Sequence, residues 1–144
     1  FNTYVDVVCS ALPKSGCVDK MVVKSMWHDS GVSEMPAVSL LDELHCTNSV
    51  WIISNTSEKH IVKLKTKFDF LKHIDGVITS DRAGAYKPYQ KIFDFALVEA
   101  NTRPSFSIFI DDNFANVISA ENLGFQAHHY IDYEKLCVFL NDYR

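Results

Sequence analysis

From residue 33 onward, short and mostly apolar runs alternate with longer amphipathic stretches. The apolar runs are rich in β-branched and aromatic residues and are bounded by polar ones, which predicts buried strands at 50–53, 76–79, 106–110 and 125–130. Between them, apolar residues recur every three or four positions and predict helices. Strands that are apolar on both faces and alternate with helices form parallel sheets. The sequence therefore predicts an α/β fold, a Rossmann-like parallel sheet flanked by helices.

Some helix starts can also be predicted. Pro88 favours the first turn of a helix that begins at Lys87, after a glycine-containing loop at 80–86. Residues 1–32 show two short helical patterns, no strand pattern, and too few apolar residues to fold alone. We therefore expect residues 1–33 to form a separate helical segment and residues 34–144 to form the α/β core.

The third apolar run ends in two adjacent carboxylates, Asp111 and Asp112. Two neighbouring ionised side chains repel each other, and packing does not require them, whereas a hard cation such as Mg²⁺ prefers carboxylate oxygens. In open α/β sheets, ligands bind just beyond the carboxyl ends of the strands. The alternative is that Asp111 or Asp112 caps the following helix, for which one aspartate would suffice. We expect the pair to bind a metal ion.

Two other polar groups follow apolar strands. The segment from Ser54 to Thr56 follows the first strand, and Lys87 lies beyond the second. The carboxyl ends of parallel strands meet at one edge of a sheet, so these groups should converge with Asp111 and Asp112. Taken singly, Ser54 could be a helix cap and Lys87 an exposed surface lysine. Together they predict a phosphate site, in which a hydroxyl, backbone N–H groups and a lysine bind oxygens whose charge a metal neutralises.

Composition limits the class of protein. Of the 144 residues, 47% are hydrophobic and 22% are charged, which is typical of a globular chain with a sizeable core. A net charge of −4 argues against a general nucleic-acid binder, and no apolar run is long enough to span a membrane. The four cysteines are spaced neither as a zinc module nor as a clear disulfide framework. We expect reduced thiols and a cytoplasmic location.

The polar groups resemble the motifs of a known family. Ser54-Asn55-Thr56 looks like the second motif of the haloacid dehalogenase (HAD) superfamily, and Lys87-Pro88 looks like its third. The stretch Asp111-Asp112-Asn113-Phe114-Ala115-Asn116 resembles the fourth motif and is the most specific part of the match. The resemblance covers about residues 34–130 and is strongest to phosphatases with a small helical cap, such as sugar-phosphate phosphatases. It implies that residues 1–33 are the end of such a cap.

The resemblance also implies roles for these residues in a phosphoryl transfer through an aspartyl-phosphate. Ser54 would hydrogen-bond the phosphoryl group, helped by the backbone of Asn55. Lys87 would pair with the charges of the nucleophile and the phosphate. Asp112, together with Asp111, would bind Mg²⁺ directly or through water, and Asn116 would support the metal site. Catalysis would rest largely on positioning and electrostatics.

The sequence departs from the family at its first motif. That motif is an Asp-x-Asp on the central strand, which supplies the nucleophile and the general acid/base, and no Asp-x-Asp occurs in this chain. Asp6 lies near a β-branched run, but Val8 stands where the second acid is needed, and we interpret Asp6 as a helix aspartate. Without that strand, two apolar strands would face a gap with unpaired backbone groups. We therefore expect a preceding segment or a second chain to complete the sheet.

These observations favour a Mg²⁺-dependent phosphatase that acts on a small phosphorylated metabolite and of which this chain is the C-terminal part. One alternative is a catalytically inactive HAD-like module that binds a phosphorylated ligand or a protein. A second is a haloacid dehalogenase, although such enzymes need no metal. In every case we expect the ammonium of Lys87 to point into the cleft, within reach of Asp111 or Asp112. We also expect Lys87→Ala to weaken phosphate binding with little effect on stability.

Overall fold

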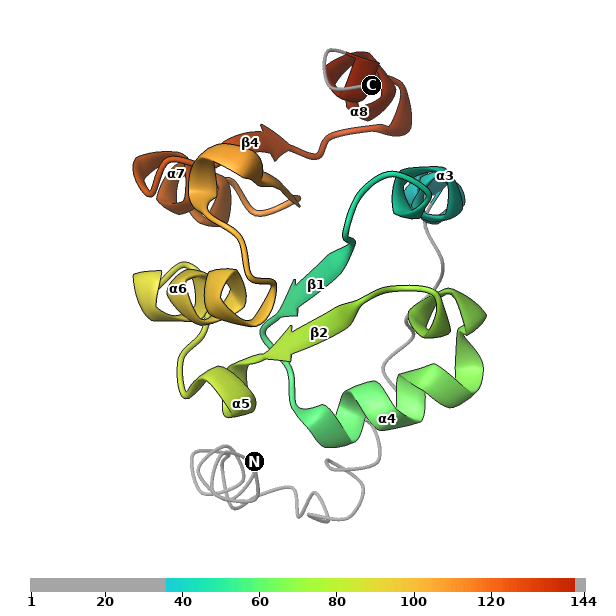
Figure 1. Ribbon diagram of the computed structural model, residues 1–144, viewed down its shortest axis with the longest axis vertical. Coiled ribbons are helices and arrows are strands. Elements are labelled where there is room, and N and C mark those ends of the chain that lie inside the picture. Colours follow the sequence, from blue (N-terminus) through green and yellow to red (C-terminus); the bar gives the residue numbers. More distant parts are fainter. Residues whose placement is uncertain (1–35, 142–144) are drawn as a thin grey trace, which may run out of the picture. The chain divides into compact units, whose positions relative to one another are not determined.

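The computed structural model describes residues 36–141, which belong to one unit that begins at Met35 (Figure 1). The interpretation of residues 1–33 as the end of a cap, and that of Asp6, lie outside the described residues. The strands are β1 (Trp51–Ser54), β2 (Gly76–Thr79), β3 (Ile108–Asp111) and β4 (Gln126–His129). The α-helices are α3 (Leu41–His45), α4 (Glu58–Lys67), α5 (Ser80–Ala83), α6 (Gln90–Glu99), α7 (Phe114–Asn122) and α8 (Tyr133–Asn141). The 3₁₀ helices are η1 (Pro36–Leu40), η2 (Asp69–Lys72) and η3 (Pro104–Phe106).

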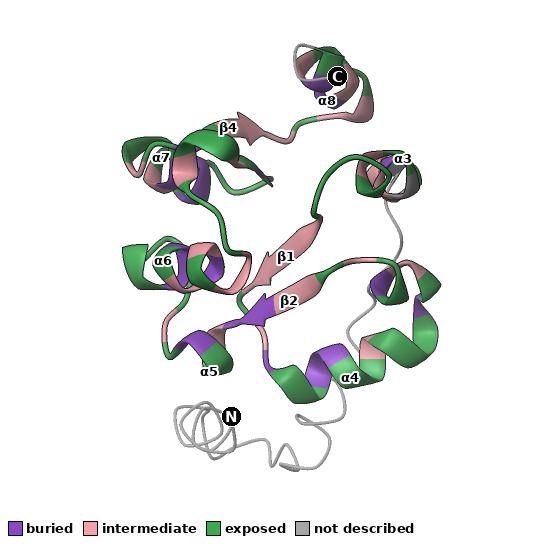
Figure 2. Cartoon of the chain, in the orientation of Figure 1, coloured by how far each residue is buried: buried purple, intermediate pink, exposed green. Residues whose placement is uncertain are grey.

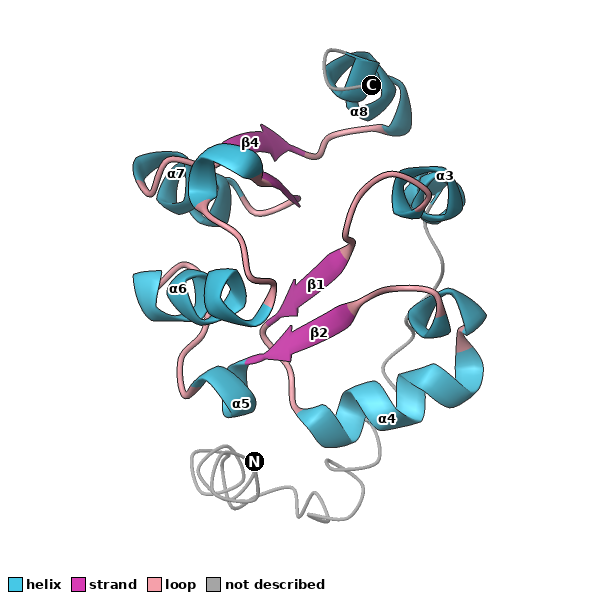
Figure 3. Cartoon of the chain, viewed as in Figure 1, coloured by secondary structure: helices cyan, strands magenta, loops and turns pink. Residues whose placement is uncertain are grey.

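The four strands form two parallel pairs. β1 pairs with β2, with Trp51 opposite Gly76, and β3 pairs with β4, with Asp111 opposite His129 (Figure 3). Helices connect the strands of each pair, and α7 packs against both β3 and β4. Parallel pairing through helical crossovers confirms the predicted α/β class.

No backbone ladder joins β1 to β3 within residues 36–141. Each of these strands therefore has one edge without a strand partner in the described part of the chain. The apolar side chains of Ile108 and Ile110 in β3 are 38% and 37% exposed, although parallel strands are normally covered on both faces. Unpaired edges on β1 and β3 are what we expect if an Asp-x-Asp strand is missing between them, which stays a prediction.

Two local predictions are wrong. The segment 80–86 contains the short helix α5, which ends at Gly84 in the left-handed conformation with φ of 61°. The next helix begins at Gln90 and not at Lys87, because Tyr89 with ψ of 135° is still extended. Lys87 therefore lies in a turn between two helices.

The main core lies between the strands and helices α5, α6 and α7. Phe93 and Ile92 of α6 are fully buried, and Phe109 of β3 and Phe125 pack against Phe93 with ring centroids 5.1 and 5.9 Å away. Figure 2 shows buried positions in α6, α7 and the end of β2. A second apolar cluster joins Leu40 to Leu136 and Leu140 of α8. The aromatic core thus fixes α6 against β3, the strand that ends in the two aspartates.

Two findings bear on the environment of the protein. None of the helices in the described part of the chain is both long and apolar enough to cross a membrane. Cys137 is a free thiol, and Cys9 and Cys17 lie outside the described residues.

Candidate active site at the strand ends

The predicted convergence of polar groups is present at the carboxyl ends of β1 and β3. Asn55, directly after β1, hydrogen-bonds to the backbone of Lys87, and Lys87 pairs with Asp111 at the end of β3. Three segments that are far apart in the sequence therefore meet at one point. The parallel direction of the strands brings their ends together, as the sequence predicts.

The centre of the site is an ion pair between Lys87 and Asp111. Lys87 Nζ lies 2.6 Å from Asp111 Oδ2, and the two side chains are only 12% and 6% exposed. The ammonium also lies 5.7 Å from the centre of the Phe109 ring. A lysine so deeply buried loses much of its hydration, and the carboxylate replaces it. The expected contact between Lys87 and one of the two aspartates is confirmed.

Asp111 accepts hydrogen bonds on both of its oxygens. Its Oδ1 accepts from the backbone N–H of Asn113 at 2.8 Å and from Asn116 Nδ2 at 3.0 Å, while Oδ2 accepts from Lys87. Burial alone would raise the pKa of Asp111, but the hydrogen bonds from Lys87, Asn113 and Asn116 together hold this pKa below its ordinary value. Asp111 is therefore an ionised carboxylate that is largely saturated by protein donors.

The lowered pKa of Asp111 predicts a loss of stability in acid. The ionised form contributes stability above the ordinary value of 3.8, and this contribution is lost as the pH falls through the lower pKa of the folded state. Asp111→Asn lacks this contribution, so the free energy of unfolding of wild type and variant should converge as the pH falls below about 4. Denaturant unfolding from pH 7 to pH 2 measures the difference, and a constant difference over that range would contradict the prediction.

Asp112 differs from Asp111 in the exposure and in the hydrogen bonding of its side chain. Its side chain is exposed and accepts no hydrogen bond from the described residues. Its backbone carbonyl accepts a hydrogen bond from His129 Nε2 at 2.9 Å, which fixes the peptide after Asp112. The cap of α7 is Asn113, whose side chain accepts from the N–H of Ala115. Helix capping therefore does not explain either aspartate.

The residues at the end of β1 and just after it make different contacts. Ser57, and not Ser54, caps α4 and accepts from the N–H of His60, so the interpretation of Ser54 as a helix cap is wrong. Ser54 is half-buried at the end of β1. The side chain of Asn55 faces Lys87 and binds both its N–H and its carbonyl group. Our expectation for Asn55 concerned only its backbone, so the sequence did not reveal this side-chain contact.

His129 is a further contact that sequence reasoning missed. The sequence alone assigns no specific contact to the adjacent His128 and His129. Parallel pairing sets His129 opposite Asp111. The His129 ring hydrogen-bonds to the carbonyl of Asp112, and its centroid lies 5.3 Å from the centroid of the Phe114 ring. The only signal in the sequence was that the fourth predicted strand ends near these histidines.

The donors present suit Mg²⁺ only in part. No group of three or more metal-binding side chains occurs among residues 36–141. The free carboxylate of Asp112 is a hard oxygen ligand, and Asp111 has most of its lone pairs engaged. Mg²⁺ commonly keeps several waters and takes one or two carboxylates together with phosphate oxygens. Asp112 therefore fits such an ion, provided that water, phosphate or another segment supplies the remaining ligands.

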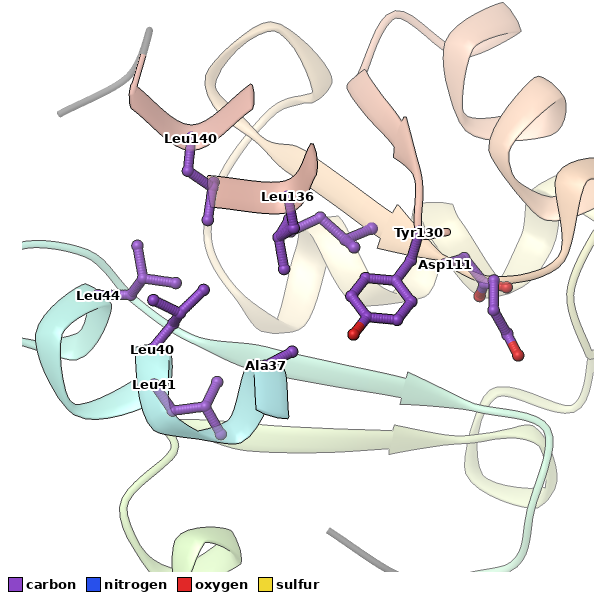
Figure 4. A pocket seen from close by; sticks show the side chains of 10 residues that line it. Ala37, Leu40, Leu41, Leu44, Asp111, Tyr130, Leu136 and Leu140 are labelled. Carbon is purple, nitrogen blue, oxygen red and sulfur yellow. The ribbon is translucent and has the colours of Figure 1, made fainter. Parts of the chain in front are cut away.

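A cavity of about 390 Å³ adjoins the two aspartates. Figure 4 shows leucines of η1, α3 and α8 on opposite sides of it, with Tyr130 and Asp111 nearer one end. Ile110 from β3 also lines it. The cavity is thus apolar along its length and carries carboxylates at one end, where it is lined by residues of β3, a strand with one edge unpaired in the described part of the chain.

Comparison with known proteins identifies the family and the fold. Residues 19–129 match the haloacid dehalogenase-like hydrolase family. Among solved structures, a HAD family enzyme of Bacteroides thetaiotaomicron, in complex with magnesium and inorganic phosphate, is 21% identical with a TM-score of 0.72. L-2-haloacid dehalogenase of Xanthobacter autotrophicus, with chloropropionic acid covalently bound, is 19% identical with a TM-score of 0.69. A HAD phosphatase of Thermococcus onnurineus is 22% identical with a TM-score of 0.66. No curated protein matches the chain.

The chain belongs to the haloacid dehalogenase-like hydrolase family. The matches to the three structures cover 93%, 97% and 88% of this chain, in the order given above. They cover 73%, 56% and 57% of those proteins, so this chain spans between about half and three quarters of their length. At these identities the structures establish the fold, and they include a phosphatase and a dehalogenase.

Proposed function

We propose that the site belongs to a Mg²⁺-dependent phosphatase that hydrolyses a small phosphorylated metabolite. The observation that carries this proposal is the difference in environment between the two aspartates. Asp111 is saturated by Lys87 and two other donors, while Asp112 beside it is exposed and free to bind a cation. A cation site next to a buried lysine suits a dianionic phosphate.

We assign a role to each residue of the site. Asp112 would hold Mg²⁺, which would neutralise phosphate charge. Lys87 presents its ammonium to the same anion and forms an ion pair with Asp111. The hydroxyl of Ser54, at the end of β1, donates a hydrogen bond to a phosphoryl oxygen. Asn116, which is 5% exposed, orients Asp111 and so acts on the metal site only indirectly.

We propose that the nucleophile arrives on a strand that fills the gap between β1 and β3. Three observations support this: the unpaired edges of both strands, the exposure of Ile108 and Ile110, and the apolar cavity that ends at the aspartates. A parallel strand there would satisfy both edges and bring an Asp-x-Asp at its carboxyl end close to Asp112. A segment that precedes Phe1 or a second chain would supply it.

One other function has specific support. The absence of Asp-x-Asp from the sequence favours an inactive module that binds a phosphorylated ligand without hydrolysing it. A dehalogenase is less consistent with the free carboxylate of Asp112, because dehalogenation needs no metal. Turnover that requires Mg²⁺ indicates the phosphatase, turnover without metal indicates the dehalogenase, and binding without turnover indicates the inactive module.

The test is hydrolysis of a panel of sugar and nucleotide phosphates by the natural protein, with Mg²⁺ and with a chelator. We expect turnover only with Mg²⁺, and at least a tenfold loss in Asp112→Asn, because one charged ligand is removed. Asp94→Asn, at an exposed position of α6, is the matched control and should retain activity.

Three other outcomes would contradict this expectation. Phosphate binding without turnover would favour the inactive module. Metal-independent release of halide from 2-chloropropionate would favour the dehalogenase. If Asp112→Asn matched wild type in phosphatase activity, the assignment of the metal site would be wrong.

A further inference from the structure

The side chain of Asn55 forms a reciprocal pair of hydrogen bonds with the backbone of Lys87. Asn55 Oδ1 accepts from the Lys87 N–H at 2.7 Å, and Asn55 Nδ2 donates to the Lys87 carbonyl at 2.9 Å. The two residues are 32 positions apart in the sequence. One amide side chain thus satisfies both polar backbone groups of the lysine, in the way that a neighbouring strand would.

Lys87 needs such support because it lies outside regular structure. It is in the turn between α5 and α6, where no ladder or helix fixes its backbone. On its other side, the Pro88 carbonyl accepts from Ser119 Oγ of α7 at 2.6 Å. The turn is therefore held from two directions, by the segment after β1 and by α7.

We propose that Asn55 is a positioning residue that fixes the backbone of Lys87 so that its ammonium meets Asp111 and the phosphate. A lysine side chain has four flexible bonds, and ordering it costs conformational entropy. If its Cα were free to move as well, the ammonium would lose its fixed position relative to Asp111. The role in catalysis rests on the proposed phosphatase function, but the effect of Asn55 on Lys87 does not.

The competing explanation is that Asn55 binds the substrate directly. Asn55 is an exposed residue close to the site, so exposure alone does not exclude this. Its Oδ1 and one of its Nδ2 hydrogens are engaged by Lys87, which leaves little capacity for a ligand. A positioning residue should lose its effect once Lys87 has no ammonium, whereas a substrate-binding residue should keep it.

The first test measures the chemical reactivity of Lys87 and needs no activity. The natural protein is labelled with trace acetic anhydride, and acetylation of Lys87 is measured by mass spectrometry relative to Lys91, whose ammonium lies near the Gly84 carbonyl. Asn55→Ala should raise the relative labelling of Lys87 at least threefold, because its side chain leaves the buried pair more often. Asn48→Ala, which removes an asparagine with two side-chain hydrogen bonds at the other end of β1, should not change it.

The second test is a double-mutant cycle with Lys87→Ala, read out as kcat/KM with Mg²⁺. We expect Asn55→Ala to lower kcat/KM about tenfold in the wild-type background, mainly through kcat, and less than twofold in Lys87→Ala. Equal losses in both backgrounds would overturn the proposal and indicate a direct substrate contact. Unchanged labelling of Lys87 in Asn55→Ala would overturn it as well.

Failure of the proposed function would be distinguishable from failure of this inference. If no variant and no wild type hydrolysed phosphate esters, the phosphatase assignment would be wrong, while labelling would still decide whether Asn55 positions Lys87. If Asn55→Ala proved too unstable to isolate, Asn55→Asp, which keeps the acceptor and loses the donor, replaces it. The same increase in Lys87 labelling is then expected, and its absence contradicts the proposal.

Discussion

Replacing Phe93 by alanine should lower the free energy of unfolding by about 3–5 kcal/mol, the usual range for a buried phenylalanine. Phe93 is fully buried in α6, and its ring meets those of Phe109 and Phe125 in tilted, edge-type contacts. Truncation would remove the centre of this aromatic group and leave a cavity between α6 and β3. Urea denaturation, followed by circular dichroism, measures the change.

Val98 provides a matched control on the same helix. Its side chain is 77% exposed, so Val98→Ala should change stability by no more than about 0.5 kcal/mol. If Phe93→Ala cost less than about 1 kcal/mol, the aromatic group would not be the core that holds α6 against β3. Since β3 ends in Asp111, we also expect Phe93→Ala to loosen the site before global unfolding.

Much of the fold follows from the sequence because its strands are short apolar runs between polar segments. The strand at 76–79 agrees with the structure in full, and the one at 50–53 differs from β1 by a single residue at each end. The start of α6 does not follow, because a proline suits both a first helical turn and a tight turn. The sequence does not distinguish these, and contacts of Lys87 and Pro88 with Asn55 and Ser119 fix the turn.

The candidate site could be predicted only as a set of residue types at strand ends. Strand order and direction suffice to bring Lys87 near Asp111, because both follow parallel strands. The different states of Asp111 and Asp112 do not follow, since adjacent aspartates look alike in a sequence. What separates them is the loop conformation, in which one carboxylate turns toward Asn113 and Asn116 and the other toward solvent. Partners such as Asn55 and His129 depend on the same tertiary detail.

The unpaired edges of β1 and β3 bear on whether the protein is inactive or is completed by another strand. The sequence lacks Asp-x-Asp, and within residues 36–141 the sheet lacks a ladder between those two strands. A missing motif alone would be consistent with an inactive protein that keeps an intact sheet. The unpaired edges, the exposed isoleucines of β3 and the adjoining cavity together favour a strand that comes from elsewhere.

Lys87→Ala should reduce kcat of the natural protein by about 10²–10³-fold, as expected when one charged donor to a phosphoryl group is removed. It should also lower the free energy of unfolding by about 1–3 kcal/mol, because Asp111 is left as a buried carboxylate without its cation. The sequence alone suggested little effect on stability. The burial of both side chains, 12% and 6% exposed, changes that expectation. Steady-state kinetics and denaturant unfolding measure the two effects.

Replacing Asp111 together with Lys87 separates the effect of the ion pair on stability from the effect of the lysine on catalysis. In Lys87→Ala with Asp111→Asn, no unpaired charge stays buried, so stability should recover relative to Lys87→Ala while activity stays low. Lys87→Arg should restore stability better than activity, because a planar guanidinium pairs with a carboxylate but does not replace a compact ammonium beside a phosphate. Full activity in Lys87→Ala would contradict a catalytic role for the lysine. A double variant no more stable than Lys87→Ala would show that the ion pair does not explain the stability loss.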